Sequence, residues 1–182
     1  EGETPAASGP NVMDIDFDAL IANETDSTLK DMHEYFRDRT PTEKNQYTGM
    51  FQGKNLLLFT GEAFWIGAVN EQYTPTLYKL AHSGFVFENF YNPLWYYSTV
   101  DGEYAATTGL IPTNQVNASQ RYAGKNGVSM YFSMGNQLRA LGYPTLAYHN
   151  NTANYYDRNL SHPNLGYDFY ACDTGLDVAM TW

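Results

Sequence analysis

The feature of this 182-residue sequence that most restricts its fold is a short apolar run, Leu56 to Phe59, followed at once by Thr60, Gly61 and Glu62. A run of this length without polar alternation is typical of a strand that is buried on both faces, as in a parallel sheet. Open α/β sheets place their chemistry at the carboxyl ends of such strands. We therefore expect a buried parallel strand that delivers the carboxylate of Glu62 to a sheet edge.

Helix and strand patterns alternate along the rest of the chain. Residues 74–84 predict a short helix, with Thr74 as N-cap and proline at its first position, and residues 85–91 alternate like a strand. A second helix is expected from Ser98 or Thr99 to Gly109, a third within residues 129–143, and a third strand over residues 144–150. This alternation predicts an α/β fold with a largely parallel sheet.

Composition narrows the class of partner. The chain has 20 acidic and 10 basic residues, for a net charge of -10. This charge repels phosphate backbones and argues against nucleic acid as a partner. An anionic small substrate would need a local cation, such as a metal ion. The single cysteine, Cys172, cannot form an internal disulfide, and no apolar run approaches the roughly 18 residues of a membrane-spanning helix.

The N-terminal segment differs from the rest in charge, since residues 1–39 contain 10 acids and 3 bases. Residues 1–10 are typical of a mobile tail. Apolar residues at helical spacing between Ile15 and Phe36 predict two short amphipathic helices with a break at residues 23–27. We interpret residues 1–47 as an acidic linker with short helices and residues 48–182 as part of a compact domain.

Three of the predicted strand ends lead into residues that can perform chemistry. Glu62 is either a hard oxygen ligand for a divalent cation or an acid that stabilises a helix start. Thr99 is either an N-cap or a nucleophile in the positive field of a helix start. His149 and Arg158 belong either to a polar pocket wall with a cation for phosphate or to a tyrosine-rich surface loop.

Several ordered blocks carry a family resemblance. The strings "GMFQGKNLLLFTGEAF", "TPTLYKLAHSGFVFENFY", "STVDGEYAATTGLIP", "GNQLRALGYPTLAYHN" and "YYDRNLSHPNLGYD" resemble the catalytic domain of lipoteichoic acid synthase and its relatives, in the alkaline phosphatase and sulfatase superfamily. The resemblance covers about residues 48–182. It implies an alkaline phosphatase/sulfatase-like α/β fold, a mostly parallel sheet with helices on both faces, of which this sequence contains the N-terminal part only.

The resemblance also implies roles for individual residues. Glu62 matches the family's ligand for a catalytic Mn²⁺ (or Mg²⁺), and Thr99 matches the threonine that is both metal ligand and nucleophile. The substrate-binding residues of the family fall on a second set of positions, in the loop after the third predicted strand: His149, Asn151, Tyr156 and Arg158. Asn151 stands where the family often has aspartate and Tyr156 where it has tryptophan, so the wall that recognises glycerol is altered.

The implied reaction is phosphoglycerol transfer from phosphatidylglycerol, through a covalent intermediate on Thr99, to a polyol phosphate acceptor. A sulfatase is disfavoured because the sequence around Thr99 lacks the C/S-x-P-x-R motif. A phosphoethanolamine transferase, a hydrolase of the same superfamily and a non-catalytic glycerol phosphate binding module remain as alternatives.

The family takes further metal ligands from an Asp-His pair, and this sequence contains no Asp-His dipeptide. We therefore expect the remaining ligands outside this chain, in the C-terminal remainder of the domain or in a separate chain, and expect the 182 residues alone to be inactive. The implied location is the extracellular face of the bacterial cell membrane, with the membrane anchor outside this sequence.

Overall fold

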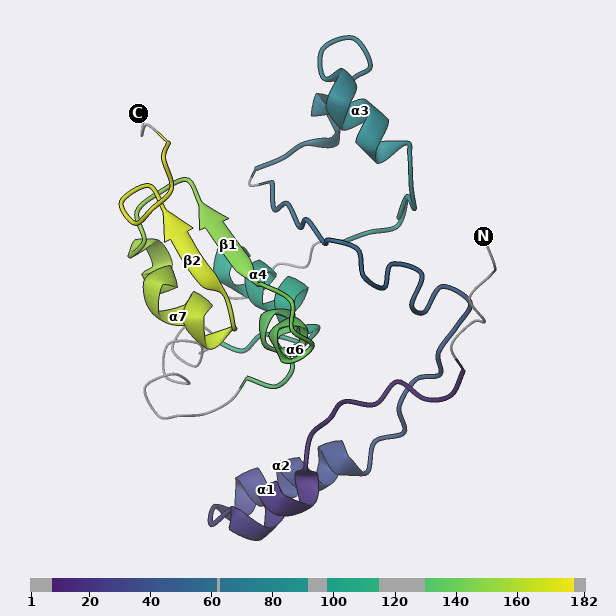
Figure 1. Cartoon of the computed structure of the whole chain (residues 1–182), viewed down its shortest axis with the longest axis vertical. Coiled ribbons are helices and arrows are strands. Elements are labelled where there is room, and N and C mark those ends of the chain that lie inside the picture. Colours follow the sequence, from purple (N-terminus) through teal and green to yellow (C-terminus); the bar gives the residue numbers. More distant parts are fainter. Residues whose placement is uncertain (1–7, 62, 92–97, 115–129, 179–182) are drawn as a thin grey trace. The chain divides into compact units, whose positions relative to one another are not determined.

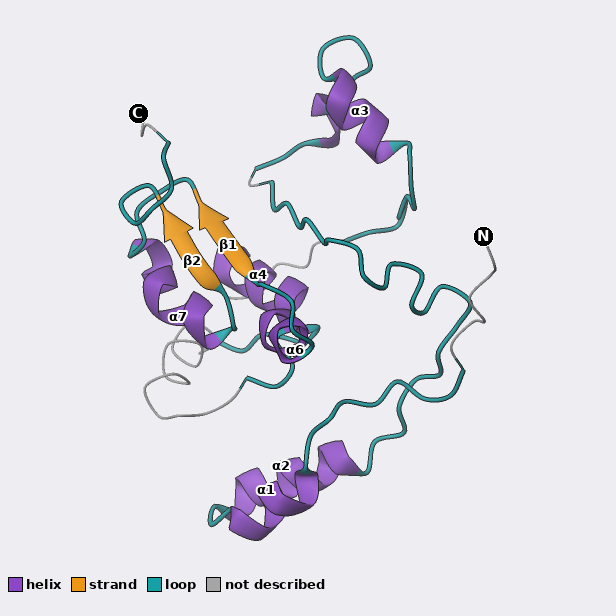
Figure 2. Cartoon of the chain, in the orientation of Figure 1, coloured by secondary structure: helices purple, strands orange, loops and turns teal. Residues whose placement is uncertain are grey.

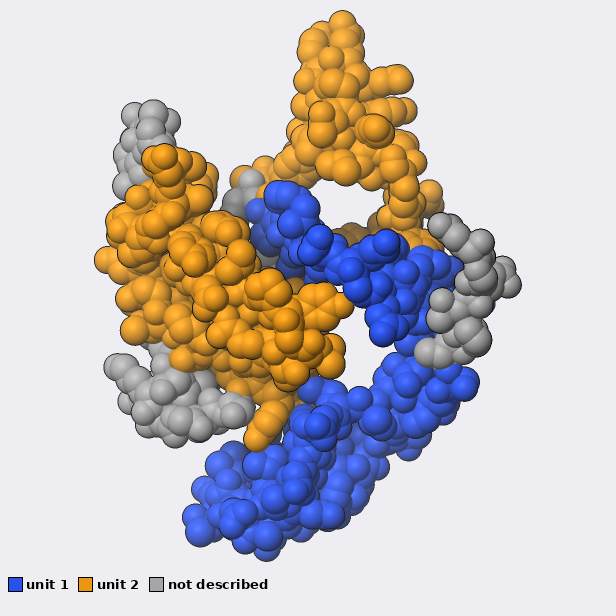
Figure 3. Space-filling view, viewed as in Figure 1, with its two compact units in different colours: residues 1–60 blue, residues 61–182 orange. Residues whose placement is uncertain are grey.

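The computed structural model of the chain describes residues 8–61, 63–91, 98–114 and 130–178 (Figure 1). The contacts divide the chain into two units, residues 1–60 and residues 61–182 (Figure 3). The sequence predicts an earlier start for the catalytic domain, at residue 48, and that boundary stays a prediction.

The first unit contains two helices that pack on each other, α1 (Phe17–Asn23) and α2 (Ser27–Arg37). Each begins after an aspartate whose carboxylate accepts backbone hydrogen bonds from the first turn. Asp16 accepts from the N–H of Ala19, and Asp26 accepts from those of Thr28 and Leu29. Such caps satisfy N–H groups that have no partner within the helix. The two predicted helices are therefore present, with the break where the sequence places it.

The second unit contains the remaining elements (Figure 2): the helices η1 (Ile66–Ala68), α3 (Pro75–Ala81), α4 (Ser98–Thr108), α6 (Met134–Ala140), η2 (Tyr155–Asp157) and α7 (Arg158–Asn164), with the strands β1 (Leu146–His149) and β2 (Asp168–Ala171). The helices α3, α4 and α6 and the strand β1 confirm sequence predictions. Helix α4 ends at a glycine, Gly109, whose φ of 70° suits a left-handed helix end.

The strands β1 and β2 are parallel and joined through α7, which packs on β2. In their register Leu146 lies opposite Asp168, and His149 lies opposite Ala171. A parallel pair joined by a helix is the basic unit of α/β folds. It places the polar residues that follow His149 at the carboxyl end of the strands.

A close backbone contact joins helix α6 to the chain just before β2. The hydroxyl of Ser133 donates to the backbone carbonyl of Leu165, and both residues are fully buried. A Cβ atom at Gly135 would lie 2.4 Å from the same carbonyl oxygen, so only glycine fits there. The small core of this unit therefore depends on α6 approaching the α7–β2 turn.

Two predicted strands are wrong. The run after Asn55 and residues 85–91 form no strand, and their large apolar side chains are exposed, by 85% at Phe59 and 76% at Phe87. A strand satisfies its backbone polar groups only by pairing with a neighbour, and among the described residues neither run has one. The described sheet is consequently a two-stranded part of the larger, mostly parallel sheet that the sequence predicts.

Candidate functional site

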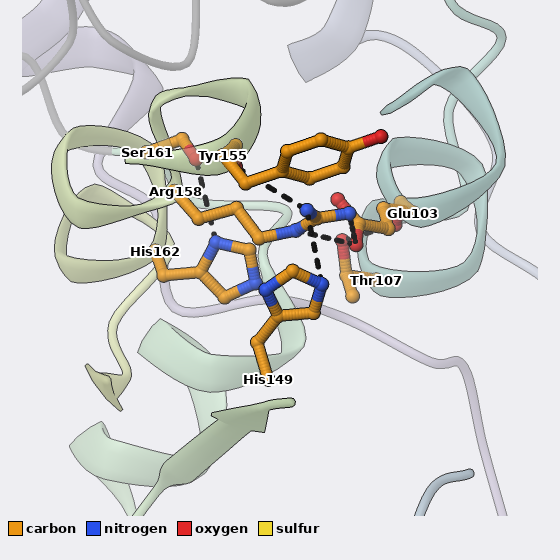
Figure 4. Close-up of polar contacts among 7 residues, drawn as sticks. All are labelled: Glu103, Thr107, His149, Tyr155, Arg158, Ser161 and His162. Atoms are coloured by element: carbon orange, nitrogen blue, oxygen red, sulfur yellow. Dashed lines mark hydrogen bonds and ion pairs between the residues drawn. The ribbon is translucent and has the colours of Figure 1, made fainter. Parts of the chain in front are cut away.

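The site is centred on Arg158, the first residue of α7, whose side chain is buried. Its Nε and Nη2 donate to the same carboxylate oxygen, Oε1 of Glu103, at 2.9 and 2.6 Å (Figure 4). Its Nη1 lies 3.3 Å from the backbone carbonyl oxygen of Tyr155 and 3.4 Å from Nε2 of His149. Four of the five N–H donors of the guanidinium thus have partners on three different segments of the chain.

Glu103 is positioned by α4, the helix that also carries Thr99. Residues four apart lie on one face of a helix, so Thr99, Glu103 and Thr107 follow one another along the same side. The Thr107 hydroxyl donates to the backbone carbonyl of Glu103 at 2.7 Å. Thr99, which is half-buried, is therefore one helical turn before the carboxylate that pairs with Arg158.

His149 is the last residue of β1 and brings an imidazole to Arg158. Its ring stacks with that of Tyr155 at 5.9 Å between centroids. Burial lowers the pKa of His149, and the charge of Arg158 lowers it further, while the backbone of Thr152 acts in the opposite direction. His149 is therefore held in its neutral form at pH 7.

A second imidazole, that of His162, belongs to the same cluster. Burial, then Arg158 and His149, lower the pKa of His162 from 6.5 to about 4. Its Nδ1 lies 3.3 Å from the hydroxyl of Ser161. Neither His162 nor Glu103 is among the site residues that the sequence predicts. Helical spacing could have identified both residues from the sequence: His162 follows Arg158 by four residues, and Glu103 follows Thr99 by four, so each pair lies on one face of a helix.

The loop between β1 and α7 has an unusual backbone. Tyr156 and Asp157 both adopt left-handed conformations, with φ of 56° and 54°. Residues with side chains occupy this region at a cost, and such positions cluster at functional sites. The ring of Tyr156 lies 5.3 Å from the guanidinium carbon of Arg158, as a cation–π contact. The strained segment thus presents an aromatic face to the arginine.

The four predicted substrate-binding residues all lie on this loop or at its ends. The structure brings His149, Tyr156 and Arg158 into direct contact around the guanidinium. The amide oxygen of Asn151 instead accepts the backbone N–H of Thr152 at 2.7 Å. The roles assigned to these residues stay predictions. Glu62 lies outside the residues that the structure describes.

Comparison with known proteins places this sequence in a family. The family model described as Sulfatase matches residues 54–180. The chain belongs to the sulfatase family. It is also 25% identical over 168 residues to lipoteichoic acid synthase 2 of Bacillus subtilis (strain 168), a match that covers 86% of this chain and 25% of the relative. The chain thus spans about a quarter of that protein's length, and no solved structure matches it.

These matches confirm a lipoteichoic acid synthase-like domain of the sulfatase superfamily. They imply an alkaline phosphatase-like α/β fold, with which the parallel β1–α7–β2 unit agrees, and they support a phosphotransferase or hydrolase as the class of enzyme. No helix within the described residues combines the length and apolar character needed to cross a bilayer.

Enzymes of this superfamily commonly use divalent metal ions, which proteins bind through several His, Cys, Asp or Glu side chains. No three His, Cys, Asp or Glu side chains gather into a possible metal site anywhere in the described ranges. The hydroxyl of Thr99 is a hard oxygen donor that suits Mn²⁺ or Mg²⁺, but a catalytic metal usually takes three or more protein ligands. The ligands that would complete such a site with Thr99 are not found among the described residues.

Proposed function

We propose that this chain forms part of a metal-dependent phosphoglycerol transferase of the lipoteichoic acid synthase type, with Thr99 as nucleophile. The observation that carries this proposal is the ion pair between Glu103 and Arg158, residues 55 positions apart in the sequence. It joins the helix of the candidate nucleophile to the arginine of the candidate phosphate site. Phosphoryl transfer requires a nucleophile and an anion-binding group that are held in place together, and Arg158 pairs with the residue one helical turn after Thr99.

The charges of the cluster support the need for a metal. Glu103 compensates the charge of Arg158, and the two imidazoles have lowered pKa values that keep them neutral at pH 7. The cluster therefore offers little net positive charge to a phosphate. We propose that Glu62 and Thr99 bind Mn²⁺ or Mg²⁺ together with ligands from outside this chain. Such an ion would supply charge neutralisation and favour the alkoxide of Thr99.

In the proposed reaction, the Thr99 hydroxyl oxygen forms a bond to the phosphorus of phosphatidylglycerol, and the bond from phosphorus to the diacylglycerol oxygen breaks. The proton that the Thr99 hydroxyl loses balances the one that the diacylglycerol oxygen gains, so diacylglycerol leaves as the alcohol. The hydroxyl of a polyol phosphate acceptor, or water, then displaces Thr99 from phosphorus, and its proton restores the Thr99 hydroxyl. The second N–H of Arg158 Nη2 has no partner among the described residues, and we propose that it donates to a phosphoryl oxygen while the ring of Tyr156 packs against the transferred group. The proposed location is the extracellular face of the bacterial membrane.

The test is Thr99→Ala in the intact protein that contains this chain. We expect release of diacylglycerol from phosphatidylglycerol to fall by at least about 10³-fold, because no other described group occupies the nucleophile's place on α4. Thr108→Ala makes the same chemical change on the same helix, at a hydroxyl that donates to the carbonyl of Tyr104, and should retain turnover. Turnover retained by Thr99→Ala would remove the residue from its proposed role.

A second candidate is a phosphoethanolamine transferase, favoured by the changes at Asn151 and Tyr156 from the family's usual residues. Phosphatidylglycerol and phosphatidylethanolamine offered to the same preparation would separate the two reactions. A non-catalytic glycerol phosphate binding module would bind both headgroups and release diacylglycerol from neither.

A further inference from the structure

Glu103 has an unusual arrangement for an ion-paired carboxylate. Both Nε and Nη2 of Arg158 donate to one oxygen, Oε1, and the guanidinium is almost completely buried. A guanidinium is a rigid planar fork, so a contact that fixes its Nε and Nη2 edge also fixes the direction of Nη1. Glu103 therefore determines where the third nitrogen of Arg158 points.

Nη1 points at His149 and Tyr155. It lies 3.4 Å from Nε2 of the imidazole, at the long end of a hydrogen bond, and 3.3 Å from the backbone carbonyl oxygen of Tyr155 (Figure 4). Arginine nitrogens only donate hydrogen bonds at any pH that a folded protein survives. In this contact Nε2 of His149 must consequently be the acceptor, without a proton.

An imidazole that accepts at Nε2 carries its single proton on Nδ1. Nδ1 of His149 is buried and makes no hydrogen bond of ordinary geometry with the described residues. The contact with Arg158 therefore assigns the ring the tautomer that carries its proton on Nδ1.

We propose that Glu103 is a positioning residue of the phosphate site: through Arg158 it holds His149 as the neutral Nδ1–H tautomer. The functional meaning rests on the proposed function, in which His149 then faces substrate as a neutral group and not as a base at Nε2. The structural claim itself involves neither metal nor substrate, so it is tested on the intact protein that contains this chain, with neither of them added.

The test is a long-range ¹H–¹⁵N correlation spectrum of the ¹⁵N-labelled protein at pH 8, where the imidazoles are neutral. His149 is assigned by the loss of its signals in His149→Gln. We expect a protonated Nδ1 and an unprotonated Nε2 in the unmodified chain. In Glu103→Ala this single-tautomer pattern should be lost, with both nitrogens shifting toward the averaged values of an exchanging ring. Glu103→Gln keeps an acceptor at Oε1 and should restore much of the pattern.

The matched control is Asp168→Asn, which removes the acid of another arginine pair, Arg139 with Asp168, in the same unit. It should leave the signals of His149 unchanged. Arg158→Lys keeps a cation near Glu103 but has no fork to reach His149 as well, so it should lose the pattern even if Glu103→Ala fails to fold.

An Nε2–H tautomer in the unmodified chain would overturn the proposal, as would a folded Glu103→Ala or Arg158→Lys chain that retains the original pattern. These outcomes are separate from the failure of the proposed function, which is decided by turnover of Thr99→Ala. If the spectra show the expected Nδ1–H tautomer and Thr99→Ala is still active, the positioning role of Glu103 is supported and the proposed reaction is contradicted.

Discussion

Two arginine–carboxylate pairs in the same unit differ mainly in burial. The side chains of Arg158 and Glu103 are 4% and 23% exposed, and those of Arg139 and Asp168 are 47% and 59% exposed, although the shortest N–O distances are similar, at 2.6 and 2.9 Å. A buried charge that loses its partner stays desolvated, whereas an exposed one is solvated by water. The same contact therefore has a different consequence at each place, and the buried pair is the one at the candidate site.

The largest expected effect comes from breaking the buried pair. Glu103→Ala leaves the guanidinium of Arg158 buried without its carboxylate, which should lower the free energy of unfolding by about 3–5 kcal/mol. Urea unfolding at pH 7, followed by fluorescence, measures the change. Glu103→Gln retains an acceptor for the two N–H donors and should lose less. If Glu103→Ala lowered the free energy of unfolding by less than about 1 kcal/mol, burial of Arg158 would not make the ion pair important for stability.

The next effect is a pH dependence that the buried cluster should have and the exposed pair should lack. The pKa of His162 is about 4 in the folded chain and near 6.5 when unfolded, so the unfolded state binds more protons between these values. The stabilisation is fully present above about pH 6.5 and is lost as the pH falls toward 4. The shift corresponds to roughly 3 kcal/mol, and the lowered pKa of His149 adds to it in the same direction.

Urea unfolding from pH 7 to pH 4.5 tests this dependence. His162→Phe removes the titrating group from its position beside Phe169 and should flatten the dependence. His82→Phe, at an exposed position after α3, is the matched control and should keep it. An unchanged slope in His162→Phe would assign the acid sensitivity to another group.

The strands show how far sequence patterns predict this fold. The pattern at residues 144–150 and the run after Asn55 both indicate strands, yet only the first contains one, β1. The difference is the partner: β1 pairs with β2, which α7 returns to its side, and the run after Asn55 has no paired neighbour among the described residues. An apolar pattern shows that a segment has side chains to bury. The segment forms a strand only where a neighbouring strand pairs with its backbone.

The residues of the candidate site also differ in how well the sequence predicts them. Residue type, spacing and family resemblance predict roles for Thr99, His149, Tyr156 and Arg158, because the predicted chemistry belongs to each side chain itself. Glu103 was not recognised, since its importance depends on Arg158, a residue that only the fold brings within 2.6 Å. His162 was not recognised either, for the same reason. Contact partners that are distant in the sequence produce no local sequence pattern. The most useful indication is then a residue four positions from a predicted site residue on the same helix.

The smallest expected effect comes from the exposed pair. Asp168→Asn removes a carboxylate whose arginine keeps a second contact, since Nε of Arg139 also donates to the hydroxyl of Thr145 at 3.1 Å. Water solvates the remaining charge, so the free energy of unfolding should fall by no more than about 1 kcal/mol. Screening by salt should reduce even that cost, because both partners are open to solvent.

Urea unfolding of Asp168→Asn and the unmodified chain at 0.05 and 0.5 M NaCl makes the comparison with Glu103→Ala direct. The difference between the two chains should shrink at high salt for Asp168→Asn and persist for Glu103→Ala, because salt does not reach a guanidinium that is almost completely buried. An Asp168→Asn cost as large as that of Glu103→Ala, and equally insensitive to salt, would mean that the link between α6 and β2 matters through geometry and not through exposure. Burial would then no longer distinguish the arginine of the candidate site from the arginine on the surface.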